Sequence, residues 1–230
     1  IIGKNKTVKL TSANNGYYQT NGLLIDKTTW EITSSEDVLL IFDKFYAKAL
    51  DVTFTGSGSL YIYIEEDYTY PGATTKQNLM TLSNQVNISG SQDGKVRTYF
   101  IVYNDLLKAY YEKHEKDDNF NETLIPYGEV ISELPDDKLD TINIANNSHA
   151  YAHFYAPGCS LTDDNKLNVY GSFYARDINV NNKTHFHYVP FDSKDLFKNA
   201  GVPPGGDIIT VQEAKYATKK LDYKRVWTRY

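Results

Sequence analysis

Short apolar segments recur along this chain at a spacing of about eight to ten residues. Five of them follow one another in the first third of the sequence: Leu23–Ile25, Trp30–Ile32, Val38–Phe42, Leu50–Phe54 and Leu60–Ile64. Leu50–Phe54 alternates strictly between apolar and polar residues, and Leu60–Ile64 alternates between aliphatic residues and tyrosine, which is the period of a half-buried strand. Similar segments return between residues 141 and 189. The pattern predicts an all-β chain of many short strands.

The residues between these segments distinguish two β architectures. Segments such as Thr55–Ser59 consist of Thr, Ser and Gly, which supply positive φ angles and local hydrogen bonds at tight corners. Evenly spaced short strands occur in sandwiches and in solenoids. A parallel β-helix uses about 20 or more residues for each turn of three short strands, and the apolar spacing matches that count. We therefore predict one parallel β-helix (β-solenoid) domain over residues 1–230, with a β-sandwich as the alternative.

Two long segments interrupt this rhythm, and we expect both to be inserts at corners of the β-helix. Residues 65–97 open with an acidic, tyrosine-rich run, and residues 104–140 place apolar side chains at helical spacing between Leu106 and His114. A second short helix is expected after Asp192, ending near Gly201, within a tail of about 190–230. In that tail, Ile208–Val211 is strand-like and Gln212–Leu221 is helix-like.

Composition excludes some partners. The 24 Lys and Arg residues against 29 Asp and Glu residues give a formal net charge of −5, which argues against nucleic acid and against anionic lipid. No apolar run approaches the roughly 18 residues that span a bilayer, so we expect no membrane crossing in this segment. The chain begins at Ile1 without Met, which favours an excised ectodomain. The single Cys159 leaves the compartment open.

One part of the chain resembles a known family. The matching segments are Ala152–Leu161, Leu167–Ile178 and Asn181–Tyr188, with a weaker echo in Leu60–Ile64. They resemble the solenoid-like C-terminal domain of PilX-type and related type IV pilus-assembly proteins, in a Tyr-Ala-Pro, Tyr-Gly-Ser and His-Tyr order. The chain departs from that pattern at Val189, where the family has an acid, and at Asp163–Asn165, which replaces a Gly-Asn corner.

This resemblance implies an extracellular location and a non-enzymatic role. It implies the head domain of a minor pilin or pilin-like protein in a cell-surface filament, with a structural and adhesive function. The implied partners are other pilin subunits and a host-surface or matrix glycan or protein, with no nucleic acid. The anchoring apolar helix of the family is expected upstream of Ile1, and the two inserts are expected to make the contacts.

The histidines form a candidate metal site. His185 and His187 alternate on one predicted strand and therefore share a face, while His153 and Cys159 are expected nearby; zinc uses such ligands. The competing interpretation is that they are surface histidines of an aromatic-rich strand. We predict no metal, no cofactor and no catalytic residue, while the sequence leaves open whether His153, His185 and His187 bind a metal.

The remaining candidate sites are acidic clusters and rows of tyrosine side chains. Glu65–Asp67, Asp117–Asp118, Asp136–Asp137 and Asp163–Asn165 lack the spacing of a calcium loop and are expected to be solvated. The alternative function is a polysaccharide lyase or hydrolase on a parallel β-helix, but its acids would have to stack across neighbouring strands, where this chain has mostly Thr, Asn, Tyr and Ser. Exposed tyrosine rows, at Tyr61 and Tyr63 or at Tyr68 and Tyr70, would suit stacking on sugars, although a surface this rich in tyrosine displays such rows without a ligand.

Overall fold

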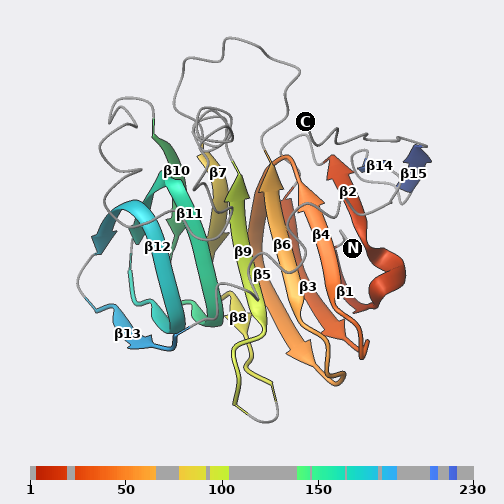
Figure 1. Cartoon of the computed structure of the whole chain (residues 1–230), viewed down its shortest axis with the longest axis horizontal. Coiled ribbons are helices and arrows are strands. Elements are labelled where there is room, and N and C mark those ends of the chain that lie inside the picture. Colours follow the sequence, from red (N-terminus) through yellow and green to blue (C-terminus); the bar gives the residue numbers. More distant parts are fainter. Residues whose placement is uncertain are drawn as a thin grey trace, which may run out of the picture.

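The described part of the chain is almost entirely β-strand. The computed structural model describes residues 4–19, 24–65, 78–91, 94–103, 139–145, 147–163, 165–180, 183–190, 208–211 and 218–221. These residues form one 15-stranded sheet (Figure 1) with a single 3-10 turn, η1 (Ser12–Asn14), and no α-helix. The all-β prediction is confirmed.

Two series of parallel strands meet in one long strand. The first series, in order of pairing, is β1 (Lys4–Leu10), β3 (Leu24–Ile32), β5 (Phe45–Phe54), β7 (Asn78–Ser83), β10 (Asp140–Ile144) and β11 (His149–Asp163). The second is β2 (Gly16–Gln19), β4 (Val38–Phe42), β6 (Leu60–Glu65), β9 (Thr98–Tyr103) and again β11. The last residues of β11 pair with β10 and its earlier residues with β9, so the sheet folds back at this strand.

The remaining strands extend this arrangement. β8 (Asn87–Ile88) pairs with β5 and β11, β12 (Asn168–Val180) pairs with β11, and β13 (His185–Tyr188) pairs with β12, all in parallel. β14 (Ile208–Val211) runs parallel to β2, and β15 (Thr218–Leu221) pairs with β14. Among the described strands, only the β14–β15 pair is antiparallel, so the β-sandwich alternative, which needs antiparallel layers, is not what the pairing shows.

A constant register stacks equivalent side chains on one another. In β1, β3 and β5 the paired residues lie 22 positions apart, as Lys4 with Asp26 and Asp26 with Lys48. Parallel strands in such register bring inward residues onto inward residues. One column passes through seven strands: Val8, Trp30, Val52, Ile88, Ala150, Val169 and Phe186. Its five middle members are fully buried.

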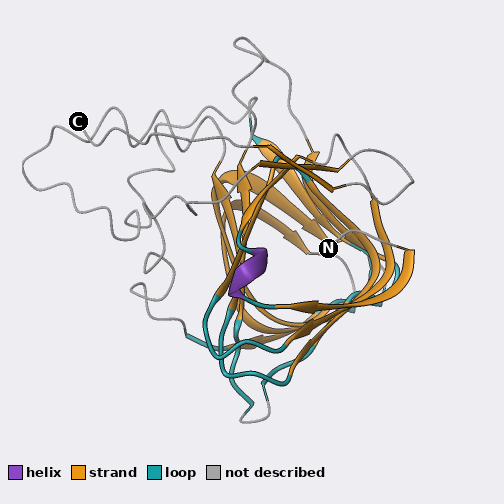
Figure 2. Cartoon of the chain, turned by 90° about the vertical axis from the view of Figure 1, so that its right-hand side faces the viewer, coloured by secondary structure: helices purple, strands orange, loops and turns teal. Residues whose placement is uncertain are grey.

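The strands surround a central core (Figure 2). Aromatic side chains make up much of this core. Phe154 lies between Phe100 and Phe173, with ring centroids 4.9 Å and 4.8 Å away. At the N-terminal side, the rings of Trp30 and Phe45 approach to 5.9 Å. Burial of side chains of this size supplies the main stabilising free energy of such a fold.

The bends of the first strand series repeat one backbone conformation. Seven of the eight non-glycine residues with positive φ in the described chain lie where this series bends or shortly after one of its strands ends: Asn5, Lys27, Ala49, Asn84, Gln85, Asn147 and Lys166. The eighth, Lys183, follows β12. Pairing skips these positions, as between Lys4 with Asp26 and Lys6 with Thr28. A left-handed residue at each level turns the chain sharply.

Glycine has a different role from the one expected at Thr55–Ser59. Gly56 and Gly58 do not adopt a left-handed conformation; a Cβ on either would lie 2.0 Å from the carbonyl oxygen of Ser34 or Glu36. These glycines therefore allow successive corners to pack backbone against backbone. The expectation of positive φ angles in this segment is wrong.

Residues 65–97 are less of an insert than predicted, because β7 and β8 lie within them and pair in the main sheet. The helix predicted between Leu106 and His114 and the one after Asp192 lie outside the described residues. In the tail, the strand at Ile208–Val211 is confirmed, whereas Thr218–Leu221, expected as helix, is a strand. The described residues contain no helix with the length and apolar character needed to span a membrane.

Candidate functional site

Three aromatic side chains form a row on the outer surface near the C-terminal end of the sheet. Tyr151 on β11, Tyr170 on β12 and His187 on β13 occupy equivalent register positions. The rings of Tyr151 and Tyr170 stack at 4.5 Å with an interplanar angle of 6°, and those of Tyr170 and His187 at 4.2 Å and 5°. We call these residues the aromatic row. Its exposure increases toward His187.

A row of polar side chains runs beside it: three of its members lie two residues earlier on the same strands, and two more lie in register on β5 and β8. Its members in register are Asp51, Asn87, His149, Asn168 and His185, which we call the polar row. Asn87 Nδ2 donates to Asp51 Oδ1 at 2.9 Å. The His149 ring contacts Tyr151 edge-on at 5.4 Å, which joins the two rows. Parallel register therefore assembles a surface strip from five separate strands.

The stacking geometry limits what this strip can bind. Because the rings of the aromatic row lie face to face, their flat faces are covered by one another and their edges point outward. The exposed outer face of His187, on the last of the three strands, is the exception. Sugar recognition by aromatic side chains uses ring faces, so the strip offers hydrogen-bonding hydroxyl, imidazole and amide groups instead.

The structure does not bring the proposed zinc ligands together. His185 and His187 share an exposed face of β13, as expected. His153 is buried on β11, where its Nδ1 lies 2.8 Å from Ser172 Oγ, and Cys159 is buried in the core. Across the described ranges, no group of three or more His, Cys, Asp or Glu residues is placed to hold a metal ion. The predicted grouping of His153 and Cys159 with the other two histidines is wrong.

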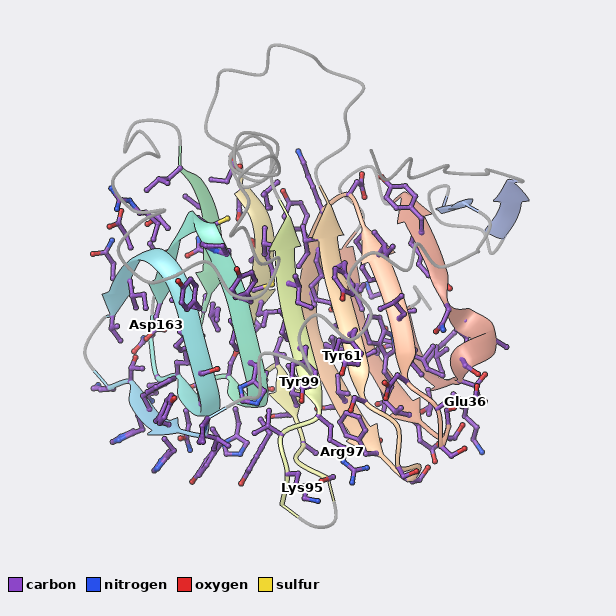
Figure 3. The ribbon with its side chains drawn as sticks, viewed as in Figure 1. Glu36, Tyr61, Lys95, Arg97, Tyr99 and Asp163 are labelled. Carbon is purple, nitrogen blue, oxygen red and sulfur yellow. The ribbon has the colours of Figure 1, made fainter. Side chains whose placement is uncertain are left out.

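His153 and Ser172 have the residue types of a base and a nucleophile, but their surroundings are those of a packed column. The two side chains are each 3% exposed, and burial lowers the pKa of His153 to about 4. The His153 ring contacts that of Tyr99 at 5.2 Å, and Tyr99 stacks on Tyr61 at 4.7 Å (Figure 3). A general base must reach the group from which it takes a proton. Burial therefore favours a structural role for this pair.

The tyrosine row expected at Tyr61 and Tyr63 is not exposed. Tyr61 is 2% exposed, and burial raises the pKa of the half-buried Tyr63. The sequence predicted correctly that side chains alternate along this strand. It did not predict that the tyrosine face of the strand is also covered. Tyr68 and Tyr70 lie outside the described residues.

The acidic clusters are not all solvated. Asp163 is buried; its carboxylate accepts hydrogen bonds from the backbone N–H of Asn165 at 3.1 Å and from the hydroxyl of Thr184. It thus ties two successive corners together, and the expectation of a solvated side chain is wrong here. Glu66, Asp67, Asp117–Asp118 and Asp136–Asp137 lie outside the described part of the chain.

Sequence reasoning missed the exposed end of the sheet. Ile178 and Val180 at the end of β12, with Phe186 and Tyr188 on β13, are 44%, 55%, 45% and 70% exposed. Their alternating pattern is that of buried strand residues elsewhere in the chain. Only their place in the last level of the described stack distinguishes them.

Comparison of the chain with family models, with curated proteins and with solved structures finds no match in any of the three.

Proposed function

We propose that this chain is a parallel β-helix and forms the extracellular head domain of a type IV minor pilin or pilin-like protein, with a structural and adhesive role in a surface filament. The observation that carries the proposal is the column from Val8 to Phe186. A stack in which each level buries its neighbour forms a stiff body along one axis, as a filament component requires.

The family resemblance supports the same role. The resembling segments coincide with β11, β12 and β13, which pair consecutively in register. Gly171 lies in the resembling Tyr-Gly-Ser segment, and a Cβ there would be 1.8 Å from the carbonyl oxygen of Ala152. The glycine of this segment is thus accounted for by strand stacking.

The proposed partners are other pilin subunits and a host-surface or matrix glycan or protein. The polar row, from Asp51 to His185, offers carboxylate, amide and imidazole groups that can hydrogen-bond to hydroxyl-rich or peptide ligands. A contribution of residues 66–77 and 104–138 to these contacts stays a prediction, because these residues lie outside the described ranges.

Immunogold electron microscopy of the source cells, with antibody raised against this chain, tests the proposal. We expect label along or at the tip of surface filaments, and loss of filaments or of surface adhesion when the coding region is deleted. Label confined to the cell interior would contradict it.

The enzymatic alternative is tested separately. Incubation with a panel of polysaccharides, followed by assays for reducing ends and for unsaturated products, is expected to yield no product. Product formation at a rate proportional to the concentration of the purified protein would overturn the non-catalytic role.

A further inference from the structure

Strand β13 presents two histidines on one face. His185 and His187 are both exposed and lie two residues apart, so their side chains project from the same side of the strand, opposite to that of Phe186. In an extended strand their Cα atoms are about 6.6 Å apart, because each residue advances the chain by about 3.3 Å. Two imidazole rings on this base can lean together until one nitrogen of each lies roughly 2.0–2.1 Å from a shared metal ion.

The aromatic row sets the orientation of one of these rings. The His187 ring lies parallel to that of Tyr170, with an interplanar angle of 5° and centroids 4.2 Å apart. The two residues are in register on adjacent strands, so the rings stack across the strands and the plane of each ring lies along the strand direction. The lone pairs of imidazole nitrogens lie in the ring plane. A nitrogen of His187 can therefore point along β13 toward His185 without disturbing the stack.

The nitrogens of both rings are available to a ligand. Within the described residues, neither His185 nor His187 makes a hydrogen bond or an ion pair, in contrast to His153, whose Nδ1 lies 2.8 Å from Ser172 Oγ. Asn168 and Tyr170 lie in register beside the two histidines on β12. Their amide and hydroxyl groups are of the kind that hydrogen-bonds to water on a metal ion.

We propose that His185 and His187 form a two-imidazole chelate site for a divalent transition-metal ion, with Cu²⁺ as the preferred ion and water in the remaining coordination positions. Imidazole suits Cu²⁺, Ni²⁺ and Zn²⁺, and among these divalent ions Cu²⁺ binds nitrogen ligands most tightly. Mg²⁺ and Ca²⁺ prefer oxygen ligands, so this site discriminates against them.

This pair is what the structure leaves of the metal hypothesis raised by the sequence. Burial removes His153 and Cys159 from it, whereas His185 and His187 keep the shared exposed face on which the hypothesis was based. No third His, Cys, Asp or Glu of the described residues completes the site, so water fills its other positions. The inference uses only the geometry of β12 and β13 and does not depend on the filament role.

Isothermal titration calorimetry of the 230-residue chain with Cu²⁺ tests the site. H185Q and H187Q should each raise the dissociation constant by about 100-fold, because the second imidazole of a chelate binds the ion intramolecularly. The matched control H149Q removes an imidazole of the polar row from β11 and should leave the dissociation constant unchanged. Ni²⁺ and Zn²⁺ should bind more weakly than Cu²⁺.

An exchange variant, F186H/H187F, tests whether the shared face matters. It keeps the same side chains but moves one histidine to the opposite side of β13, so its affinity should fall to that of H187Q. Circular dichroism checks that each variant is folded, and the glutamine variants change only exposed side chains if the exchange variant is not. Electron paramagnetic resonance of the Cu²⁺-loaded chain should show coupling to two imidazole nitrogens, and to one in H185Q or H187Q.

Four results would each overturn the proposal. They are an absence of Cu²⁺ binding, wild-type affinity in H185Q or H187Q, wild-type affinity in a folded F186H/H187F, and a loss in H149Q as large as that in H187Q.

Discussion

At some positions the close approach of successive strands leaves room only for glycine. Gly171 shows this most clearly, since a Cβ there would overlap the Ala152 carbonyl group of the preceding level. Gly94 provides a contrast: its φ is +74°, but no atom lies within 4 Å of the position that a Cβ would occupy.

Replacing Gly171 with alanine should therefore destabilise the fold more than replacing Gly94. We expect G171A to lower the free energy of unfolding by about 3 kcal/mol through backbone displacement, and G94A by about 1 kcal/mol through its left-handed conformation. Urea unfolding followed by circular dichroism measures both. Equal losses for the two variants would show that close approach is not the reason for Gly171.

His153 makes stability depend on pH. Burial lowers its pKa in the folded protein to about 4, below the ordinary value of 6.5. Between these two values the unfolded chain binds more protons than the folded one, so the contribution of the neutral imidazole is complete above pH 6.5 and is lost as the pH falls toward 4. The loss amounts to at most about 3 kcal/mol.

Urea unfolding at pH 7 and at pH 4.5 measures this effect. The pH-dependent loss should shrink in H153Q, whereas H185Q, at an exposed position, should retain the full loss. An identical pH dependence in H153Q and the wild-type chain would argue against His153 as the titrating group.

At the scale of elements, the repeated left-handed corner sets where the strands of the first series bend. Most residues at this corner are Asn or Lys, but Ala49, with a φ of 51°, occupies it without the local hydrogen bonds that asparagine can form. A corner that tolerates several residue types is difficult to recognise from sequence, and no glycine marks it.

Ala49→Asn should stabilise the protein because asparagine adopts the left-handed region at lower cost. We expect a gain of about 0.5–1 kcal/mol in thermal or urea unfolding. A49V, with a β-branched side chain, should lose stability by a similar amount or more. A stabilising A49V would mean that this corner is not constrained by its backbone conformation.

At the scale of the whole molecule, the cost of losing an aromatic ring should depend on its level in the stack. Phe154 is 1% exposed between two other phenylalanine rings, whereas Phe186 is 45% exposed on β13, the last described level of the stack. Both residues occupy apolar positions of strands with similar sequence patterns.

We expect F154A to cost about 3–5 kcal/mol and F186A less than about 1 kcal/mol, measured by urea unfolding. Both variants remove the same side-chain atoms, so the difference between their losses of stability reports the effect of position. Comparable losses would show that Phe186 is buried in solution.

Some features of this protein follow from adjacent residues in the sequence, and others depend on residues far away in the sequence. The strand at Leu50–Phe54 and that at Leu60–Ile64 could be predicted because alternation is a property of adjacent positions. The burial of Tyr61, the separation of His153 from His185 and His187, and the hydrogen bonds of Asp163 could not, because each depends on which strand lies next to it. The candidate metal grouping failed for the same reason.

The sequence by itself determined that this chain is built of strands formed by apolar segments that recur about every eight to ten residues, because side-chain alternation and turn composition are local properties. Tertiary structure alone decided which apolar strand residues are core and which are surface. Val169 and Phe186 stand in the same column, yet one is buried and the other exposed, because burial of a side chain in a stack requires a further strand on each side.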